Sequence, residues 1–292
     1  MNTVKTMTHE EQERLRSALT AGGAIEASEL SAGTYFVARS EGAVVTAYRS
    51  GKVLFQGRES EWQVRLAEEI LAHDEPAGRA LKFPIVGGDE SGKGDLFGPL
   101  VVAAFAVRDE SERREAVRAG ARDCKLMTDT EVHAVATRLG SIGRSKIRVL
   151  MPHEYNSRYA RLHNVNVLLN EVYAELLLEL AAASRAHTVI LDKYGARART
   201  LWKTPQNFCF VVETHAERYP EVAAASVLAR AAFLDGLERT ARDSGVGRLP
   251  KGASQEAQAF MRRLALDNGK DVLRSVAKAN FAPVKACLES LF

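Results

Sequence analysis

Two strongly apolar runs, residues 83–90 and 97–107, flank a glycine-rich turn and constrain the fold more than any other feature. Their length and their content of branched residues predict buried β-strands. Further along the chain, the strand candidates are 145–151, 187–194 and 208–213, and the helical stretches are 165–183, 223–243 and most of the remainder, apart from a loop at 247–254. This order of strands and helices predicts an α/β domain with a mixed sheet and flanking helices.

Residues 1–75 have the pattern of a smaller, separate unit. Thr8 precedes an amphipathic stretch that predicts a helix over 8–22, and a second helix is predicted from Ser60. Between the helices lie three β-rich runs, at 34–42, 43–50 and 51–57. The polar stretch 73–80 contains proline and glycine and is typical of a linker. We therefore predict a small α+β domain at 1–75, a linker at 76–82 and a larger domain at 83–292.

The bulk properties exclude several classes of protein. The 292 residues carry a formal charge of +3, which permits nucleic-acid binding without requiring it. No apolar run reaches the 18 residues of a membrane span, and the polar N-terminal segment argues against secretion. The cysteines, Cys124, Cys209 and Cys287, have neither zinc-site nor disulfide spacing. These properties predict a cytoplasmic protein without a membrane partner.

The turn VGGDESGKGDLFGP, at 86–99, superficially resembles a nucleotide-binding P-loop. Gly87 to Lys93 fits G-x-x-x-x-G-K, but Gly94 stands where that motif places a magnesium-binding Ser or Thr. Asp89 and Glu90 would also repel the phosphates that such a loop binds. The P-loop interpretation therefore fails, and the two carboxylates indicate a cation instead.

Three carboxylates end apolar strand candidates: Asp89 and Glu90 end one strand, and Asp192 ends another. A carboxylate beside the core is costly unless a cation or a hydrogen-bond donor accompanies it. Converging carboxylates would suit hard cations such as Mg²⁺ or Mn²⁺. The alternative is that each residue merely caps its strand, and spacing alone does not decide between the two.

Several motifs resemble the type II ribonucleases H. The stretch DESGKGDLFGPLVVAA resembles the opening motif of that family, and its GKG form is similar to ribonuclease HIII. The stretches TAYRSGKVLFQG and LPKGAS also resemble ribonuclease HIII. Further matches are EYNSRY, NVNVLL, AAASVLAR and VAKANF. The matches run in the family's order over nearly the whole chain.

The resemblance implies an RNase H-like fold preceded by a TBP-like substrate-binding domain. It also implies a monomeric endonuclease that cleaves RNA in RNA/DNA hybrids, leaves 5′-phosphomonoesters and uses Mg²⁺ or Mn²⁺. Two such ions would generate the attacking hydroxide and stabilise the leaving oxygen. Two alternatives remain: cleavage at single ribonucleotides embedded in duplex DNA, as in ribonuclease HII, and a non-catalytic nucleic-acid-binding module.

The family's four catalytic carboxylates transfer to this sequence with one uncertainty. Asp89 and Glu90 match the first two carboxylates and Asp192 matches the third, so these three are the predicted metal ligands. Glu217 is the best match for the fourth. Because its segment is one residue shorter than expected, three rivals remain: Glu221, Glu213 and Asp235.

The resemblance also implies a set of substrate-binding residues: Ser91, Gly92, Lys93, Gly94 and Lys125. Glycines allow the backbone to approach a ribose, whose 2′-hydroxyl distinguishes RNA from DNA. The family's DSKKLTD stands here as DCKLMTD, with Cys124 in place of Ser, which puts phosphate contacts in doubt. Lys251 is predicted to face a phosphate, and Lys278 is left open between a surface position and a functional one.

Overall fold

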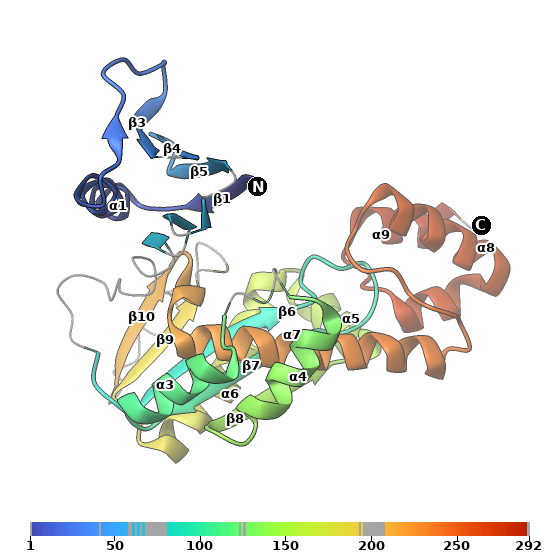
Figure 1. Ribbon diagram of the computed structural model, residues 1–292. Helices are drawn as coiled ribbons and strands as arrows, with labels where there is room; N and C mark the ends of the chain where they lie inside the picture. Colours follow the sequence, from blue (N-terminus) through green and yellow to red (C-terminus); the bar gives the residue numbers. More distant parts are fainter. Residues whose placement is uncertain are drawn as a thin grey trace. The chain divides into compact units, whose positions relative to one another are not determined.

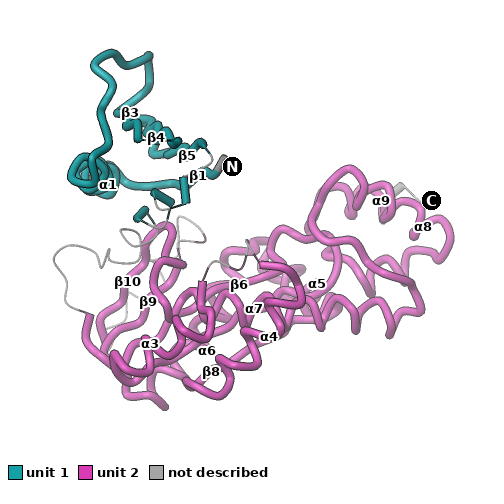
Figure 2. Tube along the Cα trace, viewed as in Figure 1, with its two compact units in different colours: residues 1–79 teal, residues 80–292 magenta. Residues whose placement is uncertain are grey.

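The chain forms two compact units, residues 1–79 and 80–292, each of which is described separately (Figure 2). The computed structural model describes residues 2–40, 42–57, 60, 61, 63, 64, 66, 67, 81–122, 124, 127–192, 194 and 208–290. The linker predicted at 76–82 falls mostly outside these residues, so its bounds stay a prediction. None of the described helices is both long enough and apolar enough to cross a membrane.

The N-terminal unit is an antiparallel sheet in the order β1-β5-β4-β3-β2, with a helix against it (Figure 1). Its elements are β1 (Asn2–Thr6), α1 (His9–Ala21), β2 (Ile25–Glu26), β3 (Thr34–Ser40), β4 (Ala43–Tyr48) and β5 (Lys52–Gly57). Thr8 begins α1 through a capping box with Glu11, which satisfies two free backbone N–H groups. The predicted small α+β domain is confirmed, but the sequence did not indicate the edge strands β1 and β2.

The sheet of the N-terminal unit has one covered face and one open face. Side chains alternate along β3, β4 and β5, and Phe36, Val45 and Phe55 lie buried in a core with Leu15 and Leu19 of α1. Period-2 alternation of this kind is the pattern of a sheet packed on one side only. In the described strands, the side chains of the opposite face are half-buried or exposed.

The C-terminal unit contains a mixed sheet in the order β10-β9-β6-β7-β8. Its strands are β6 (Ile85–Ser91), β7 (Leu100–Val107), β8 (Arg144–Leu150), β9 (Thr188–Asp192) and β10 (Cys209–Glu213). β6, β7 and β8 form an antiparallel meander, whereas β9 and β10 run parallel to β6. All five strands match the strand candidates of the sequence, and the predicted α/β fold is confirmed.

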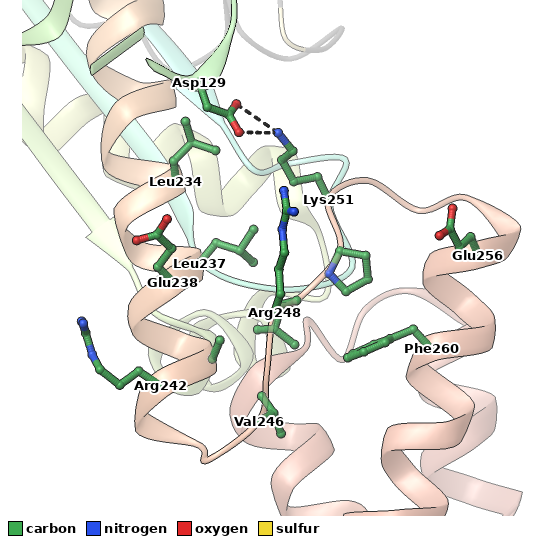
Figure 3. A pocket seen from close by; sticks show the side chains of 13 residues that line it. Asp129, Leu234, Leu237, Glu238, Arg242, Val246, Arg248, Lys251, Glu256 and Phe260 are labelled. Atoms are coloured by element: carbon green, nitrogen blue, oxygen red, sulfur yellow. Dashed lines mark hydrogen bonds and ion pairs between the residues drawn. The ribbon is translucent and has the colours of Figure 1, made fainter. Parts of the chain in front are cut away.

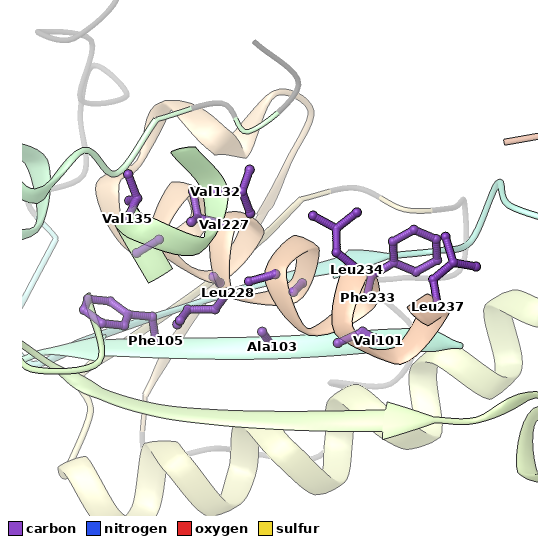
Figure 4. Packing of buried hydrophobic residues seen from close by; sticks show 14 of the residues in the cluster. Val101, Ala103, Phe105, Val132, Val135, Val227, Leu228, Phe233, Leu234 and Leu237 are labelled. Carbon is purple, nitrogen blue, oxygen red and sulfur yellow. The ribbon is translucent and has the colours of Figure 1, made fainter. Parts of the chain in front are cut away.

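Helices cover both faces of this sheet. The described helices of the C-terminal unit are α3 (Glu110–Ala119), α4 (Asp129–Leu139), α5 (Pro152–Leu162), α6 (Val165–Ser184), η3 (Ala216–Arg218), α7 (Pro220–Asp243), α8 (Gln255–Val276) and α9 (Ala282–Ser290). On one face, Val101, Ala103 and Phe105 of β7 pack with α7, which α3 and α4 also contact (Figure 4). On the other face, Leu100 and Val102 pack with α6. A sheet buried on both faces explains the nearly continuous apolar runs of β6 and β7.

Candidate active site

The strand order brings the predicted carboxylates to one edge of the sheet. β6 and β9 pair in parallel up to Gly88 and Leu191, so the residues that follow, Asp89 and Asp192, lie where this pairing ends. Asp192 is the last residue of β9, whereas β6 continues along β7 to Ser91. β10 extends the row, because Glu213 pairs with Asp192. The carboxyl ends of parallel strands are the usual place for a site in an open α/β sheet.

Asp89 and Asp192 both face the α7 side of the sheet. The Ser226 hydroxyl of α7 forms a hydrogen bond with Asp89. Asp192 Oδ1 accepts a hydrogen bond from the backbone N–H of Ala216, in the short helix η3, at 3.1 Å. At Gly87, a Cβ atom would stand 2.4 Å from the backbone of Glu221, so only glycine lets α7 lie this close to β6.

Glu90 points to the opposite side of the sheet. Its Oε2 accepts a hydrogen bond of 2.5 Å from the hydroxyl of Tyr173, a fully buried side chain of α6. The Tyr173 ring stacks on Tyr194 with 4.9 Å between centroids. Lys93 Nζ lies 3.8 Å from Glu90 Oε1 and donates to the Tyr194 carbonyl at 2.6 Å. Lys93 is thus anchored beside Glu90, and its contact with the substrate stays a prediction.

Burial, reinforced by repulsion between the carboxylates, dominates the electrostatics of this edge. Burial, together with the charges of Glu90 and Asp192, raises the pKa of Asp89 to about 7. Burial also raises the pKa of Glu90, and the charge of Asp192 adds to that effect, while Tyr173 and Lys93 oppose it. Among the described side chains, Lys93 alone lies within ion-pair distance of these carboxylates. The edge therefore carries excess negative charge.

The residues present fit a divalent cation in their chemistry. Within the described ranges, no three carboxylate, thiol or imidazole groups are already gathered closely enough to hold an ion. Glu90 is turned toward Tyr173, whereas Asp89 and Asp192 face α7. All three are hard oxygen donors with largely uncompensated charge, which is the environment that Mg²⁺ and Mn²⁺ select.

We expect the metal-free protein to become more stable as the pH falls from about 8 to about 5. The folded-state pKa of Asp89, about 7, exceeds its ordinary value, so the folded protein takes up a proton that the unfolded chain does not. Over this pH range the group contributes at most about 3 kcal/mol to the change. Thermal unfolding in EDTA across this pH range tests it, with Asp89→Asn as the comparison. Parallel pH profiles for the two proteins would contradict the expectation.

The four candidates for the fourth carboxylate have different surroundings. Glu221 is fully buried and forms an ion pair of 3.0 Å with Arg113, so it is committed to packing α7 against α3. Asp235 is exposed on α7, 3.7 Å from His133. Glu213 accepts hydrogen bonds from Arg218 and from the Tyr219 hydroxyl.

Glu217 differs from its three rivals. It lies in η3, one residue after Ala216, whose N–H binds Asp192. Its side chain is 22% exposed, and its contact with His215 Nδ1 is as long as 3.8 Å. Glu213 shares part of this environment, because it pairs in register with Asp192 and its side chain is 29% exposed. Glu213 is, however, bound to Arg218 and to the Tyr219 hydroxyl, so the match to the family motif together with its position in η3 favours Glu217.

The glycine turn follows Ser91, the last residue of β6. Gly92 has φ +87°, and a Cβ there would stand 2.2 Å from the Pro99 carbonyl oxygen, so the fold itself requires glycine. Gly94 is different, because a Cβ would find no neighbouring atom within 4 Å. The open space at Gly94 is consistent with close approach by a substrate. Lys125, also predicted to bind substrate, lies outside the described residues.

A cavity of about 780 Å³ lies between α7 and α8 (Figure 3). The carboxylates proposed for the site, Asp89, Glu90, Asp192 and Glu217, do not line it. Apolar side chains, among them Leu234, Leu237 and Phe260, form much of its lining. Lys251 lies at its rim and pairs with Asp129 at 2.7 Å. The ammonium group that was predicted to face a phosphate is therefore bound to a carboxylate in this structure.

Comparison with known proteins gives consistent matches along the chain. A family model described as "Ribonuclease HII" matches residues 86–284, and one described as "Domain of unknown function (DUF3378)" matches residues 2–69. The ribonuclease HIII of Chlamydia pneumoniae is 33% identical over 287 residues, which cover 95% of each chain. The chain belongs to the ribonuclease HIII family. The ribonuclease HIII of Chlamydia felis is 32% identical over 85% of each chain.

Solved structures of ribonuclease HIII agree with this membership. The crystal structure of Bst-RNase HIII in complex with Mn²⁺ is similar with a TM-score of 0.65 and 27% identity, covering 99% of this chain and 98% of that one. The resemblance to the family and the predicted class of enzyme, a ribonuclease, are thereby confirmed. So is the RNase H-like fold with a preceding antiparallel-sheet domain.

Two residues of the site escaped the sequence analysis of this ribonuclease HIII. Tyr173 stands in an apolar helical run and looks like an ordinary core residue, yet its hydroxyl binds Glu90. Ser226 belongs to the AAAS motif but was assigned no role, although it binds Asp89. A hydroxyl within an otherwise apolar helix was the signal available in both cases.

Proposed function

We propose that this ribonuclease HIII hydrolyses the RNA strand of RNA/DNA hybrids at the carboxylate edge of the β6–β9 pair. The observation that supports this most is the convergence of Asp89 and Asp192 at the ends of paired strands, with the glycine turn 92–94 directly after β6. The arrangement places candidate metal ligands beside a backbone segment that can read a ribose. The proposal keeps the products predicted above, 5′-phosphomonoesters.

Asp89, Asp192 and Glu217 would hold divalent ions, Mg²⁺ or Mn²⁺, with Glu90 at the margin of the site. When bound, such ions activate water and neutralise the charge that develops on the phosphate. The protein residues keep the carboxylates in place: Ser226 binds Asp89, and the Ala216 N–H binds Asp192. The raised pKa values describe a site that gains stability when cations replace protons.

Recognition of RNA is assigned to the turn after β6. Backbone groups at Gly92 and Gly94 would hydrogen-bond a ribose 2′-hydroxyl. The space that a sugar needs lies at Gly94, where a Cβ would find no neighbouring atom within 4 Å. Lys93 helps to hold the shape of the turn by binding the Tyr194 carbonyl. Specificity for RNA would therefore depend on backbone geometry more than on the identity of a charged side chain.

The decisive experiment compares two labelled substrates, an RNA/DNA hybrid and a DNA duplex with one embedded ribonucleotide. Each is incubated with the purified protein in Mg²⁺, Mn²⁺ or EDTA. The proposal expects multiple cuts in the RNA strand of the hybrid and none in EDTA. Cleavage confined to the single ribonucleotide would replace the proposal with the ribonuclease HII-like alternative, and metal-independent cleavage would exclude the metal assignment.

Glu217→Gln is expected to reduce hybrid cleavage by at least about 100-fold, with little change in the melting temperature. The reason is that a metal ligand loses its charge while nothing in the core is disturbed. Steady-state cleavage and thermal unfolding of the variant check both parts. Glu213→Gln and Asp235→Asn should lose far less activity, and inactivation by either would move the fourth carboxylate to that residue.

Glu221→Gln provides the matched control for this result. It removes the buried carboxylate that pairs with the Arg113 guanidinium at 3.0 Å, although the exposed Glu110 still lies 3.6 Å from Arg113. Breaking a buried pair costs up to about 3–5 kcal/mol. The variant should therefore lose stability, while the molecules that remain folded keep their turnover. A stable but inactive Glu221→Gln protein would contradict its assignment as a structural residue.

A further inference from the structure

Lys278 is the most unusual charged residue outside the carboxylate edge. Its side chain is fully buried, so the surface position left open by the sequence is wrong. Its Nζ donates to two backbone carbonyls, of Asp95 at 3.0 Å and of Phe97 at 3.2 Å, and lies 5.9 Å from the centre of the Tyr155 ring. Burial lowers the pKa of Lys278 to about 7, which the charge of Asp95 partly opposes.

Both carbonyls belong to the segment 92–98, which begins with the glycine turn. The backbone around Lys278 holds the far end of this segment: the Lys278 N–H donates to the Leu96 carbonyl, and the Gly98 N–H donates to the Val276 carbonyl, each at 2.9 Å. Phe97 and Ala277 form an isolated β-bridge at the same place. Residues 276–278 therefore pair with residues 96–98 like a short antiparallel strand.

The loop before α8 holds the same segment from another side. The Leu96 N–H donates to the Gly252 carbonyl at 3.0 Å, and the Gly252 N–H donates to Asp95 Oδ1 at 2.6 Å. Two distant parts of the chain thus converge on residues 95–98. Gly92 and Gly94 lie between the end of β6 and residues 95–98, so their position depends on how both ends of the turn are fixed. Lys93 adds a further anchor by donating to the Tyr194 carbonyl.

A buried ammonium group is an expensive way to fill a core position. An apolar side chain of similar length would avoid the cost of removing a charge from water. Unlike an apolar side chain, the ammonium group donates hydrogen bonds to two backbone carbonyls that point inward from a loop. These carbonyls would otherwise be buried without donors or would turn away, and the segment would change its shape.

We propose that Lys278 is a positioning residue for RNA recognition. By binding the carbonyls of Asp95 and Phe97, it fixes the segment 92–98 and so directs the backbone of Gly92 and Gly94 toward the ribose of the substrate. Lys278 itself touches neither substrate nor metal. The inference rests on the proposed function, because Lys278 would hold the turn to which the proposed function assigns RNA recognition.

The test is equilibrium binding in EDTA, where the substrate stays intact, to an RNA/DNA hybrid and to a DNA duplex of the same sequence. For Lys278→Met we expect hybrid affinity to fall about 10-fold, as for one lost hydrogen bond, while affinity for the DNA duplex is unchanged. Lys285→Met, an exposed lysine on α9, serves as the control and should leave both affinities unchanged. Equal loss toward both duplexes, or loss of thermal stability alone, overturns the proposal.

A double-mutant cycle with Gly94→Ala adds a measurement that a merely structural lysine would not affect. If Lys278 acts through the turn, the ratio of hybrid affinity to DNA-duplex affinity in the double variant should be no lower than in the more affected single variant. Additive losses overturn the proposal. Should Lys278→Met fail to fold, Lys278→Gln takes its place in both measurements. A wild-type protein that binds hybrid and DNA duplex equally, or that does not cleave the hybrid, refutes the proposed function itself and this inference with it.

Discussion

Asp89→Asn and Asp192→Asn are each expected to reduce hybrid cleavage by about 10³-fold or more while leaving the fold intact. Each change removes one charge from the edge where the parallel pairing of β6 with β9 ends. Because the bound ions supply most of the stabilisation of the transition state, a site that cannot hold them keeps little activity. Single-turnover cleavage of a labelled hybrid at saturating Mg²⁺ or Mn²⁺ measures the effect.

The expected loss is confined to catalysis. Affinity for the hybrid should persist in both variants, since binding depends on basic groups and on the glycine turn. In EDTA the melting temperature of Asp89→Asn should equal or exceed that of the wild type, because the substitution removes a buried charge and its repulsion by Glu90 and Asp192, which together raise the pKa of Asp89. Asp243→Asn, an exposed position near the end of α7, is the matched control and should cleave normally. Wild-type turnover in either site variant would refute the assignment.

The sequence predicted the strands of the catalytic unit because each is a short apolar run between turn residues. The same runs indicated the candidate metal ligands Asp89 and Asp192, which follow them, and the role of these residues as ligands stays a prediction. What it could not establish is that these two residues meet. They are about a hundred positions apart, and only the parallel pairing of β6 with β9 brings them to one edge.

Other parts of the fold and site left weaker signals. The edge strands β1 and β2 are short and polar, and α3 is rich in charge, so none of them has an apolar face that the sequence makes evident. Lys278 stands in a polar stretch, AKANF, that suggests a surface. Its burial depends on contacts with residues 95–97, which local pattern cannot reveal. The formation of these elements and the burial of Lys278 both depend on tertiary contacts.

The second large effect is expected from removal of the N-terminal unit. Deleting residues 1–75 should leave a folded nuclease that binds hybrids weakly, while turnover at saturating substrate changes much less. The unit 80–292 has its own core clusters, separate from the core of the first unit, so the remaining domain should fold. All the carboxylates proposed for the site belong to that domain.

The basis for the loss of affinity is a set of basic side chains on or beside the strands of the first unit. Arg39, Arg49 and Lys52 are exposed there, and Arg58, outside the described residues, follows β5. Arg39 and Lys52 alternate with buried neighbours and so belong to the open face of the sheet. Each contact of such a group with a phosphate releases about 0.9 counterion on a B-form duplex.

Loss of two to four phosphate contacts should flatten the plot of log affinity against log salt by roughly two to four units. Measuring hybrid affinity of the full-length and truncated proteins over a salt series checks this. A full-length variant with Arg39, Arg49 and Lys52 changed to glutamine separates charge from fold, and it should reproduce most of the flattening without loss of stability. If the first unit only supports the second, truncation will instead lower the melting temperature and leave the salt slope unchanged. That outcome would exclude a role for the first unit in binding the substrate backbone.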